Sequence, residues 1–252
     1  MPRNAAGGYI REIEVTAPLT GRDGYPLSLP AVRNVERLAI DPAMTILVGE
    51  NGSGKSTLIE AVAVAAGFNA EGGTGNFNFR TQQHIPELAR HIRLIRNPQR
   101  PRTGFFLRAE SFFNVATEIE RLDAEPGGGP LIGPGYGPKP LHEVSHGESF
   151  LSLVLHRFGP NGLYVLDEPE AAMSPTGCFA LLRRFHDLVG EGSQFIIATH
   201  SPILMSFPKA LLYTLSEQGP VASMWDRLDH VRIMRDFFGS PEVVLRELFS
   251  TD

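Results

Sequence analysis

The chain has little cysteine and no long apolar run, and both shortages limit what it can be. Its 252 residues include a single cysteine, Cys178. One thiol cannot form an internal disulfide or a thiolate metal cluster. No apolar stretch approaches the roughly 20 residues that a membrane-spanning helix needs. Residues 1–8 also lack the apolar core of a signal peptide, so we expect a cytoplasmic protein with no integral membrane segment.

The chain also lacks an overall positive charge. Its net charge of −5 argues against a protein that binds polyanions over its whole surface. The local distribution differs, because seven arginines lie between Arg80 and Arg108 against one acidic residue, Glu87. Two interpretations remain open: this segment faces nucleic acid, an acidic protein partner or a nucleotide, or it is a solvated surface that acidic residues elsewhere balance.

Residues 49–57 match the phosphate-binding loop pattern G-x-x-x-x-G-K-[ST] at every position. The apolar run 45–48 predicts a buried strand before the loop, and 58–66 predicts a helix that ends at Gly67. Glycines let the backbone fold around phosphate oxygens, and a helix N-terminus favours the same anion. We therefore predict that Lys55 reaches the β- and γ-phosphates and that Ser56 ligates Mg²⁺. The predicted nucleotide-binding residues are Gly49, Glu50, Asn51, Gly52, Ser53, Gly54, Lys55, Ser56 and Thr57.

Apolar runs alternate with predicted helices along most of the chain. This alternation favours an α/β fold of the P-loop NTPase type: a mostly parallel sheet with flanking helices, preceded by antiparallel N-terminal strands. The predicted strands lie at 9–15, 27–29, 35–40, 45–48, 103–110, 163–166, 195–199 and 211–215. The predicted helices lie at 58–66, 84–96, 112–123, 150–158 and 175–190, with a last one that begins at Pro241.

The middle of the chain predicts an insertion. We expect one domain over residues 1–252, in which residues 69–144 form an inserted lid of helices and loops. Within it, residues 127–140 hold six glycines and four prolines. Because neither a helix nor an interior strand tolerates that composition, we predict a loop there.

Two carboxylates follow the predicted strand 163–166. Ligands of open α/β sheets bind beyond the carboxyl ends of the strands, which places Asp167 and Glu168 near the phosphate loop. We predict that Asp167 holds Mg²⁺, directly or through water, and that Glu168 orients and deprotonates the attacking water.

Two further positions carry candidate chemistry. His200 ends the predicted strand 195–199 at the same edge, so we predict that it contacts the γ-phosphate. Residues 145–149 lead into the predicted helix at 150–158, with Ser145 as the candidate N-cap. Two interpretations of that serine remain open: an ordinary helix cap, or a second site for anionic oxygens.

Together these residues resemble the ATP-binding cassette (ABC) ATPases. Gly49–Thr57 resembles their Walker A motif, Leu163–Glu168 their Walker B motif with its catalytic glutamate, and residues 170–174 their D-loop. His200 resembles their switch histidine. The resemblance implies ATP and Mg²⁺ as ligands, with Glu168, His200 and Lys55 as catalytic residues.

The family's signature motif L-S-G-G-Q is only partly present. Ser145, His146, Gly147 and Glu148 stand at its place, and Ser145 and Gly147 match it. The resemblance implies an ATP-dependent homodimer in which each signature closes on the other protomer's ATP. The family's Q-loop glutamine has no clear counterpart after the strand at 103–110; Glu110 is the candidate there, while Gln82 and Gln83 lie nearer the phosphate loop.

The sequences of these motifs resemble those of compact RecF- and SMC-like members, described as AAA family ATPases, more closely than those of transporter subunits. We expect Mg²⁺-dependent ATP hydrolysis that drives head-to-tail dimerisation and conformational cycling on a partner, such as DNA or a repair or defence protein. One alternative is the energy-coupling subunit of a membrane transporter, against which the missing glutamine argues. Another is an ATP-binding switch with negligible hydrolysis, against which Glu168 argues.

Overall fold

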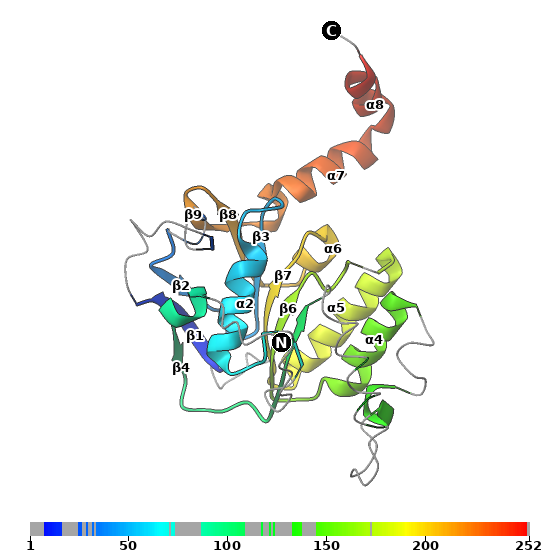
Figure 1. The fold of residues 1–252 in the computed structure, drawn as a ribbon. Coiled ribbons are helices and arrows are strands. Elements are labelled where there is room, and N and C mark those ends of the chain that lie inside the picture. The colour runs from blue at the N-terminus through cyan, green and yellow to red at the C-terminus, as the bar shows by residue number, and fades with distance from the viewer. Residues whose placement is uncertain are drawn as a thin grey trace.

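The computed structural model of the protein describes most of the chain. The described residues are 8–16, 25–26, 29, 32, 34–70, 72–73, 87–108, 117, 121, 123, 133–137, 145–171 and 173–250. They form two β-sheets with helices on both sides of the larger one, and two C-terminal helices that extend away from it (Figure 1). No helix in this described part is long and apolar enough to cross a membrane.

The larger sheet has six strands in the order β5-β6-β7-β3-β8-β9. All neighbours are parallel except β8 and β9, so the predicted α/β fold with a mostly parallel sheet is confirmed. The carboxyl ends of β3, β6 and β7 therefore meet at one edge. The strands are β3 (Met44–Val48), β5 (Thr103–Arg108), β6 (Gly162–Asp167), β7 (Gln194–Ala198), β8 (Leu211–Ser216) and β9 (Gly219–Ser223).

Helices bury both faces of this sheet. Leu163 and Val165 of β6 join the core beneath α2 (Lys55–Ala66), whereas Tyr164 and Leu166 join the core on the opposite face. Side chains of a strand alternate between faces, so burial on both sides explains why β6 reads as one continuous apolar run. The helices on the second face are α4 (His146–Arg157), α5 (Pro175–Gly190) and α6 (Pro202–Met205).

The predicted helix ends are largely confirmed. Ser174 caps α5 by accepting a hydrogen bond from the Gly177 N–H at 3.2 Å, and Pro175 occupies the first turn. Gly67 ends α2 with a φ of 99°. Ser240 precedes α8 (Pro241–Phe249) as expected, but its side chain makes no capping bond.

The smaller sheet has the order β2-β1-β4 and is antiparallel, as predicted for the N-terminal strands. Its strands are β1 (Ile10–Val15), β2 (Arg37–Ala39) and β4 (Ile92–Arg96). The predicted helix at 84–96 is wrong: Glu87–His91 forms a 3-10 helix (η1), and the next five residues form β4. Arg93 of β4 pairs with Glu14 of β1, so a partner distant in sequence overrides the helical spacing.

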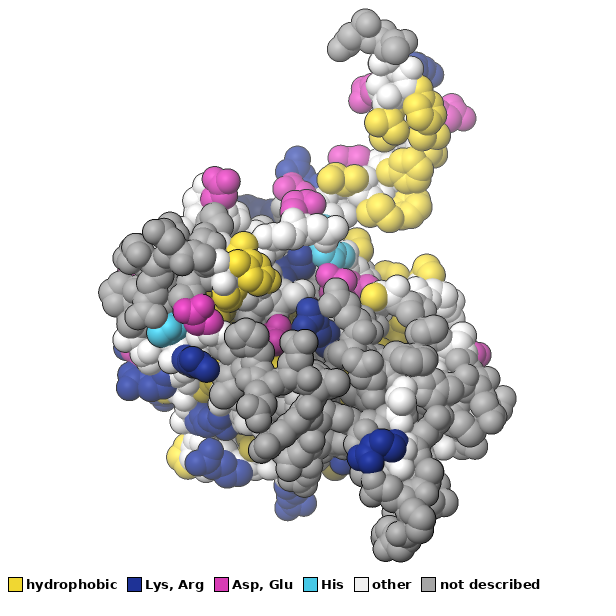
Figure 2. Space-filling model, viewed as in Figure 1, with side chains coloured by type: hydrophobic (Ala, Val, Ile, Leu, Met, Phe, Trp, Pro, Cys, Tyr) yellow, Lys and Arg dark blue, Asp and Glu magenta, His cyan; other side chains and the backbone are white. Residues whose placement is uncertain are grey.

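The C-terminal part leaves the body of the molecule. After β9 come a 3-10 turn, η5 (Trp225–Arg227), and α7 (Asp229–Gly239), which the sequence patterns did not predict, and then α8. Apolar side chains stand exposed along both helices, among them Ile233, Phe238 and Phe249 (Figure 2).

Several predicted segments lie mainly outside the described residues: the strand at 27–29, the helix at 112–123 and the loop at 127–140. Within that loop, Gly133–Tyr136 forms a 3-10 turn, η3. Inside the predicted 69–144 subregion, β4 and β5 belong to the two sheets.

Candidate nucleotide-binding site

The phosphate-binding loop connects β3 to α2 in the predicted way. Gly52 and Gly54 have φ values of 79° and 96°, which side-chain-bearing residues rarely adopt. A Cβ atom on Gly49 would lie 2.8 Å from both the Leu215 carbonyl oxygen and Ser53 Oγ. The glycines therefore provide both the turn and the close approach of the backbone that a phosphate cradle requires.

Lys55 opens α2 and points back into the loop. Its side chain is buried, and Nζ donates to the carbonyl oxygens of Gly49 at 2.7 Å and Glu50 at 2.9 Å. Burial lowers the pKa of Lys55, and the nearby Glu168 and Asp167 carboxylates oppose that shift. The ammonium group thus lies beside the two carboxylates that follow β6.

Ser56 and Asp167 meet across the edge of the sheet. The Ser56 hydroxyl donates to Asp167 Oδ1 at 3.1 Å, which joins residues 111 positions apart in sequence. Arg108 lies opposite Asp167 in the β5–β6 register, with Nε 3.8 Å from Asp167 Oδ2. The sequence patterns placed Arg108 only in the basic segment and missed this contact.

Glu168 follows directly after β6 in an uncommon conformation. Its φ is 50°, and its N–H donates to the Ala198 carbonyl of β7 at 2.9 Å. Strained backbone of this kind is concentrated at functional sites. Its Oε1 lies 3.4 Å from His200 Nε2, without hydrogen-bond geometry, and the Glu168 side chain is 38% exposed. The carboxylate therefore remains accessible to solvent.

His200 is held from two directions. Its backbone N–H donates to Glu170 Oε1 at 2.6 Å, and the Ser201 N–H donates to the same oxygen at 3.0 Å. Its ring Nδ1 lies 3.3 Å from Nε2 of His230. Glu170 thus joins the residues that follow β6 to those that follow β7.

His230 is a residue of this site that the sequence patterns missed. It lies in the first turn of α7, where burial and the neighbouring His200 lower its pKa. A lone histidine outside any motif gives no signal, and α7 itself was not predicted. The contact places the first turn of α7 against the candidate catalytic residues.

Tyr25 is a second residue without a sequence signal. Its side chain is 75% exposed, and its hydroxyl lies 3.3 Å from Thr57 Oγ1 at the start of α2. An exposed aromatic ring beside a phosphate loop offers a surface on which a nucleobase can stack.

The signature residues lie at the start of α4. Ser145 and Glu148 form a capping box: Ser145 Oγ accepts from the Glu148 N–H at 3.4 Å, and Glu148 Oε2 accepts from the Ser145 N–H at 3.1 Å. The helices α4 and α2 cover opposite faces of the sheet. Among the described residues, no hydrogen bond links this cap to Lys55. The Q-loop candidate Glu110 and the alternatives Gln82 and Gln83 lie outside the described residues.

The donor set fits a nucleotide and a hard cation. Ser53 Oγ is buried in the loop with no hydrogen-bond partner among the described residues, so it is free to donate to a phosphate oxygen. The Ser56 hydroxyl and the Asp167 carboxylate are oxygen ligands of the kind that Mg²⁺ prefers.

Residues 44–110 and 117–206 match the protein family described as "AAA domain, putative AbiEii toxin, Type IV TA system". Together they make up more than half of the chain. The chain belongs to this family.

Its relatives include two proteins named "Putative ABC transporter ATP-binding protein". One, from Streptomyces avermitilis, is 30% identical over 211 residues, which cover 79% of this chain and 35% of the relative. The other, from Methanothermobacter thermautotrophicus, is 30% identical over 105 residues, which cover 39% and 37%.

The chain spans little more than a third of the length of these curated relatives. Solved structures agree on the fold. The chain superposes on a putative metal-chelate type ABC transporter with a TM-score of 0.51 and 14% identity, covering 92% of this chain and 89% of that one. It superposes equally well on cbiO1 of Clostridium perfringens, part of the ABC transporter complex cbiONQ, covering 95% and 99%. This AAA-domain family member is thus an ABC-type P-loop ATPase in fold.

Proposed function

We propose that the chain binds Mg²⁺-ATP and hydrolyses it. The observation that carries the proposal is the hydrogen bond from Ser56 to Asp167, made beside the buried Lys55. It joins the phosphate loop to the acidic end of β6, which supports a shared site for phosphate, metal and water at one sheet edge. Lys55 and the loop N–H groups would hold the β- and γ-phosphates.

The remaining residues have distinct roles in this proposal. Ser56 and Asp167 would hold Mg²⁺, which when bound neutralises charge on the phosphate oxygens. Glu168, accessible and next to Asp167, accepts the proton of the attacking water. His200 faces Glu168 and is suited to contact the γ-phosphate.

Two residues outside the motifs complete the site. Tyr25 provides the exposed ring against which adenine stacks, beside Thr57. His230 acts as a positioning residue: its contact with His200 Nδ1 directs the other ring nitrogen, Nε2, toward Glu168.

Beyond hydrolysis, we propose a head-to-tail dimer that forms with ATP bound. Ser145 and Gly147 lie at the N-terminus of α4, where backbone N–H groups favour an anion. Within the part of the chain that the structure describes, no hydrogen bond links them to Lys55, which supports a γ-phosphate of a second copy as their ligand. The output is a conformational cycle applied to a partner. A transporter is the alternative partner, supported by the names of the relatives and separable by whether a membrane subunit co-purifies with the chain.

Glu168→Gln is the variant that tests hydrolysis. Loss of the base should lower the rate of phosphate release by about 100-fold or more. ATP binding should remain, because Lys55, Ser56 and Asp167 are unchanged. Steady-state phosphate release measures the rate, and calorimetry measures the affinity for Mg²⁺-ATP.

Two further variants make the result specific. Glu217→Gln neutralises an exposed carboxylate in the turn between β8 and β9 and should hydrolyse ATP normally. Lys55→Ala should lose binding as well as hydrolysis. Normal turnover by Glu168→Gln would disprove the assignment of Glu168 as the general base. Full ATP affinity of Lys55→Ala would disprove the assignment of the phosphate loop as the nucleotide site.

A further inference from the structure

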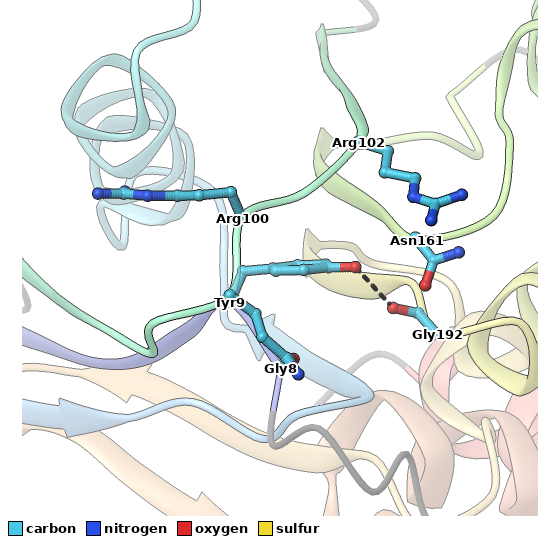
Figure 3. A pocket seen from close by; sticks show the side chains of 7 residues that line it. Gly8, Tyr9, Arg100, Arg102, Asn161 and Gly192 are labelled. Carbon is cyan, nitrogen blue, oxygen red and sulfur yellow. Dashed lines mark hydrogen bonds between the residues drawn. The ribbon is translucent and has the colours of Figure 1, made fainter.

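A cavity of about 300 Å³ lies at the opposite edge of the large sheet. It is lined by two arginines, two amide side chains and a tyrosine, together with two glycines (Figure 3). These five side chains are Arg100, Arg102, Gln99, Asn161 and Tyr9. They lie just before β1, β5 and β6, so the cavity is at the amino ends of the parallel strands β5 and β6, whereas the phosphate loop follows the carboxyl end of β3. The cavity is therefore separate from the ATP site.

Backbone hydrogen bonds hold the walls of this cavity together. The Arg102 N–H donates to the Asn161 carbonyl at 2.9 Å, and the Asn97 N–H donates to the Tyr9 carbonyl at 3.1 Å. The Tyr9 hydroxyl donates to the Gly192 carbonyl at 3.0 Å. Segments distant in sequence thus form a framework, so the cavity needs little ordering on binding.

The lining is positive and has no acidic member. Three arginines of the basic segment are engaged elsewhere: Arg93 pairs with Glu14, Arg96 donates to the Ala65 carbonyl, and Arg108 lies between Glu60 and Asp167.

Arg100 and Arg102 are the two arginines of this segment that line the cavity. Both residues are exposed, and neither guanidinium forms an ion pair or hydrogen bond with the described residues. Figure 2 shows Lys and Arg side chains gathered over β4 and the segment that leads to β5.

Positively charged guanidinium groups lie close to one another around this cavity. Burial and the neighbouring Arg100 both lower the pKa of Arg96. Burial raises the pKa of Tyr9, and the Arg102 guanidinium opposes that shift. An anion bound here would compensate this excess positive charge.

We propose that this cavity binds the phosphodiester backbone of a nucleic-acid strand. Arg102 and Asn161 point to one side, beyond the hydroxyl end of Tyr9, whereas Arg100 extends to the other side (Figure 3). Two guanidinium groups that diverge in this way cannot chelate one phosphate. They can each contact a different phosphate of one strand, with the amides as further donors.

The donor set favours phosphate over an acidic protein segment. Guanidinium and amide groups are among the side chains that contact the phosphate oxygens of nucleic acids, and here both kinds line one cavity. The neighbouring ring cannot stack on a base, because Tyr9 is buried and its hydroxyl is occupied. We therefore expect binding with little dependence on base sequence.

The test measures binding of a fluorescently labelled oligonucleotide by anisotropy, without ATP or Mg²⁺. Its result therefore does not depend on the ATPase proposal. Wild-type protein should bind, with an affinity that falls steeply between about 50 and 200 mM salt through counterion release. Arg100→Ala and Arg102→Ala should each weaken binding roughly tenfold and lower the salt slope for a single strand by about 0.7.

Arg227→Ala is the matched control, since it removes one exposed charge from η5, on the C-terminal side of the molecule. It should leave binding and salt slope unchanged. The proposal is overturned if wild-type protein does not bind at low salt, or if all three variants bind alike. Displacement by inorganic phosphate at constant ionic strength would instead indicate a single-anion site. Displacement by polyglutamate at equal charge would indicate an acidic protein partner.

Discussion

At the residue scale, one histidine outside every motif is expected to affect turnover. His230 Nε2 lies 3.3 Å from His200 Nδ1, and His200 faces the candidate base Glu168. Without this partner the His200 ring can rotate, so the proposed γ-phosphate contact is lost in a fraction of molecules. His230→Ala should therefore lower kcat about tenfold, equivalent to about 1.4 kcal/mol, with little change in KM for ATP.

Two comparisons separate positioning from stability. Ile233→Ala alters an exposed residue of the same helix and should leave kcat unchanged. His230→Gln retains a polar group and should recover part of the rate. Thermal unfolding of each variant is measured as well, and equal midpoints would exclude loss of α7 packing as the cause. An unchanged kcat in His230→Ala would remove His230 from the site.

At the scale of elements, Tyr164 connects β6 to the residue that follows α4 and its C-cap. Its hydroxyl donates to the Gly159 carbonyl at 2.8 Å and accepts from the Gly159 N–H at 2.7 Å. Its ring stacks on Phe158, with centroids 4.1 Å apart. Burial raises the pKa of Tyr164 to about 12. Ionisation of this one side chain therefore opposes the packing of α4 on the sheet.

This pKa shift predicts a loss of stability in alkali. The folded-state pKa exceeds the unfolded value of about 10, so the stabilisation is complete below pH 10 and is lost as pH rises toward 12. A shift of this size corresponds to about 2–3 kcal/mol. Tyr164→Phe should cost about 1–3 kcal/mol near neutral pH and lose this pH dependence. Urea unfolding of both proteins at about pH 8 and pH 11 measures the difference, and parallel pH profiles would contradict the prediction.

At the scale of the whole molecule, ATP that is bound and not hydrolysed should hold two copies together. Glu168→Gln is expected to accumulate as a dimer in Mg²⁺-ATP, because a ligand that binds the dimer shifts the equilibrium by mass action. Light scattering with and without Mg²⁺-ATP measures the change in mass. Addition of Ser145→Arg should abolish the dimer through steric and charge conflict at the start of α4.

The cap at Ser145 requires its own control. Ser145→Ala removes the hydroxyl of the capping box, at a cost of about 1 kcal/mol, without adding bulk or charge. In the Glu168→Gln background it should still permit a dimer. A Glu168→Gln protein that binds ATP, does not hydrolyse it and stays monomeric would reduce the Ser145 segment to a helix cap.

The sequence alone determined the features that depend on neighbouring residues. The phosphate loop, the helix that ends at Gly67 and the cap at Ser174 follow from glycine conformations, helix termini and short apolar runs. The parallel sheet also follows, because strands buried on both faces have a recognisable composition. Because ligands of such sheets bind beyond the carboxyl ends of the strands, the sequence also assigns Asp167 and Glu168 to one sheet edge.

Tertiary structure decided everything that depends on a partner distant in sequence. Residues 92–96 have helical spacing, yet they form β4 because β1 offers backbone partners and Glu14 offers a charge for Arg93. His230 reaches His200 only because α7 begins beside the ends of the strands. Arg108 and Arg102 are six residues apart in the same basic segment. β5 places one against Asp167 and leaves the other at the opposite end of the sheet, because a strand separates its two ends in space.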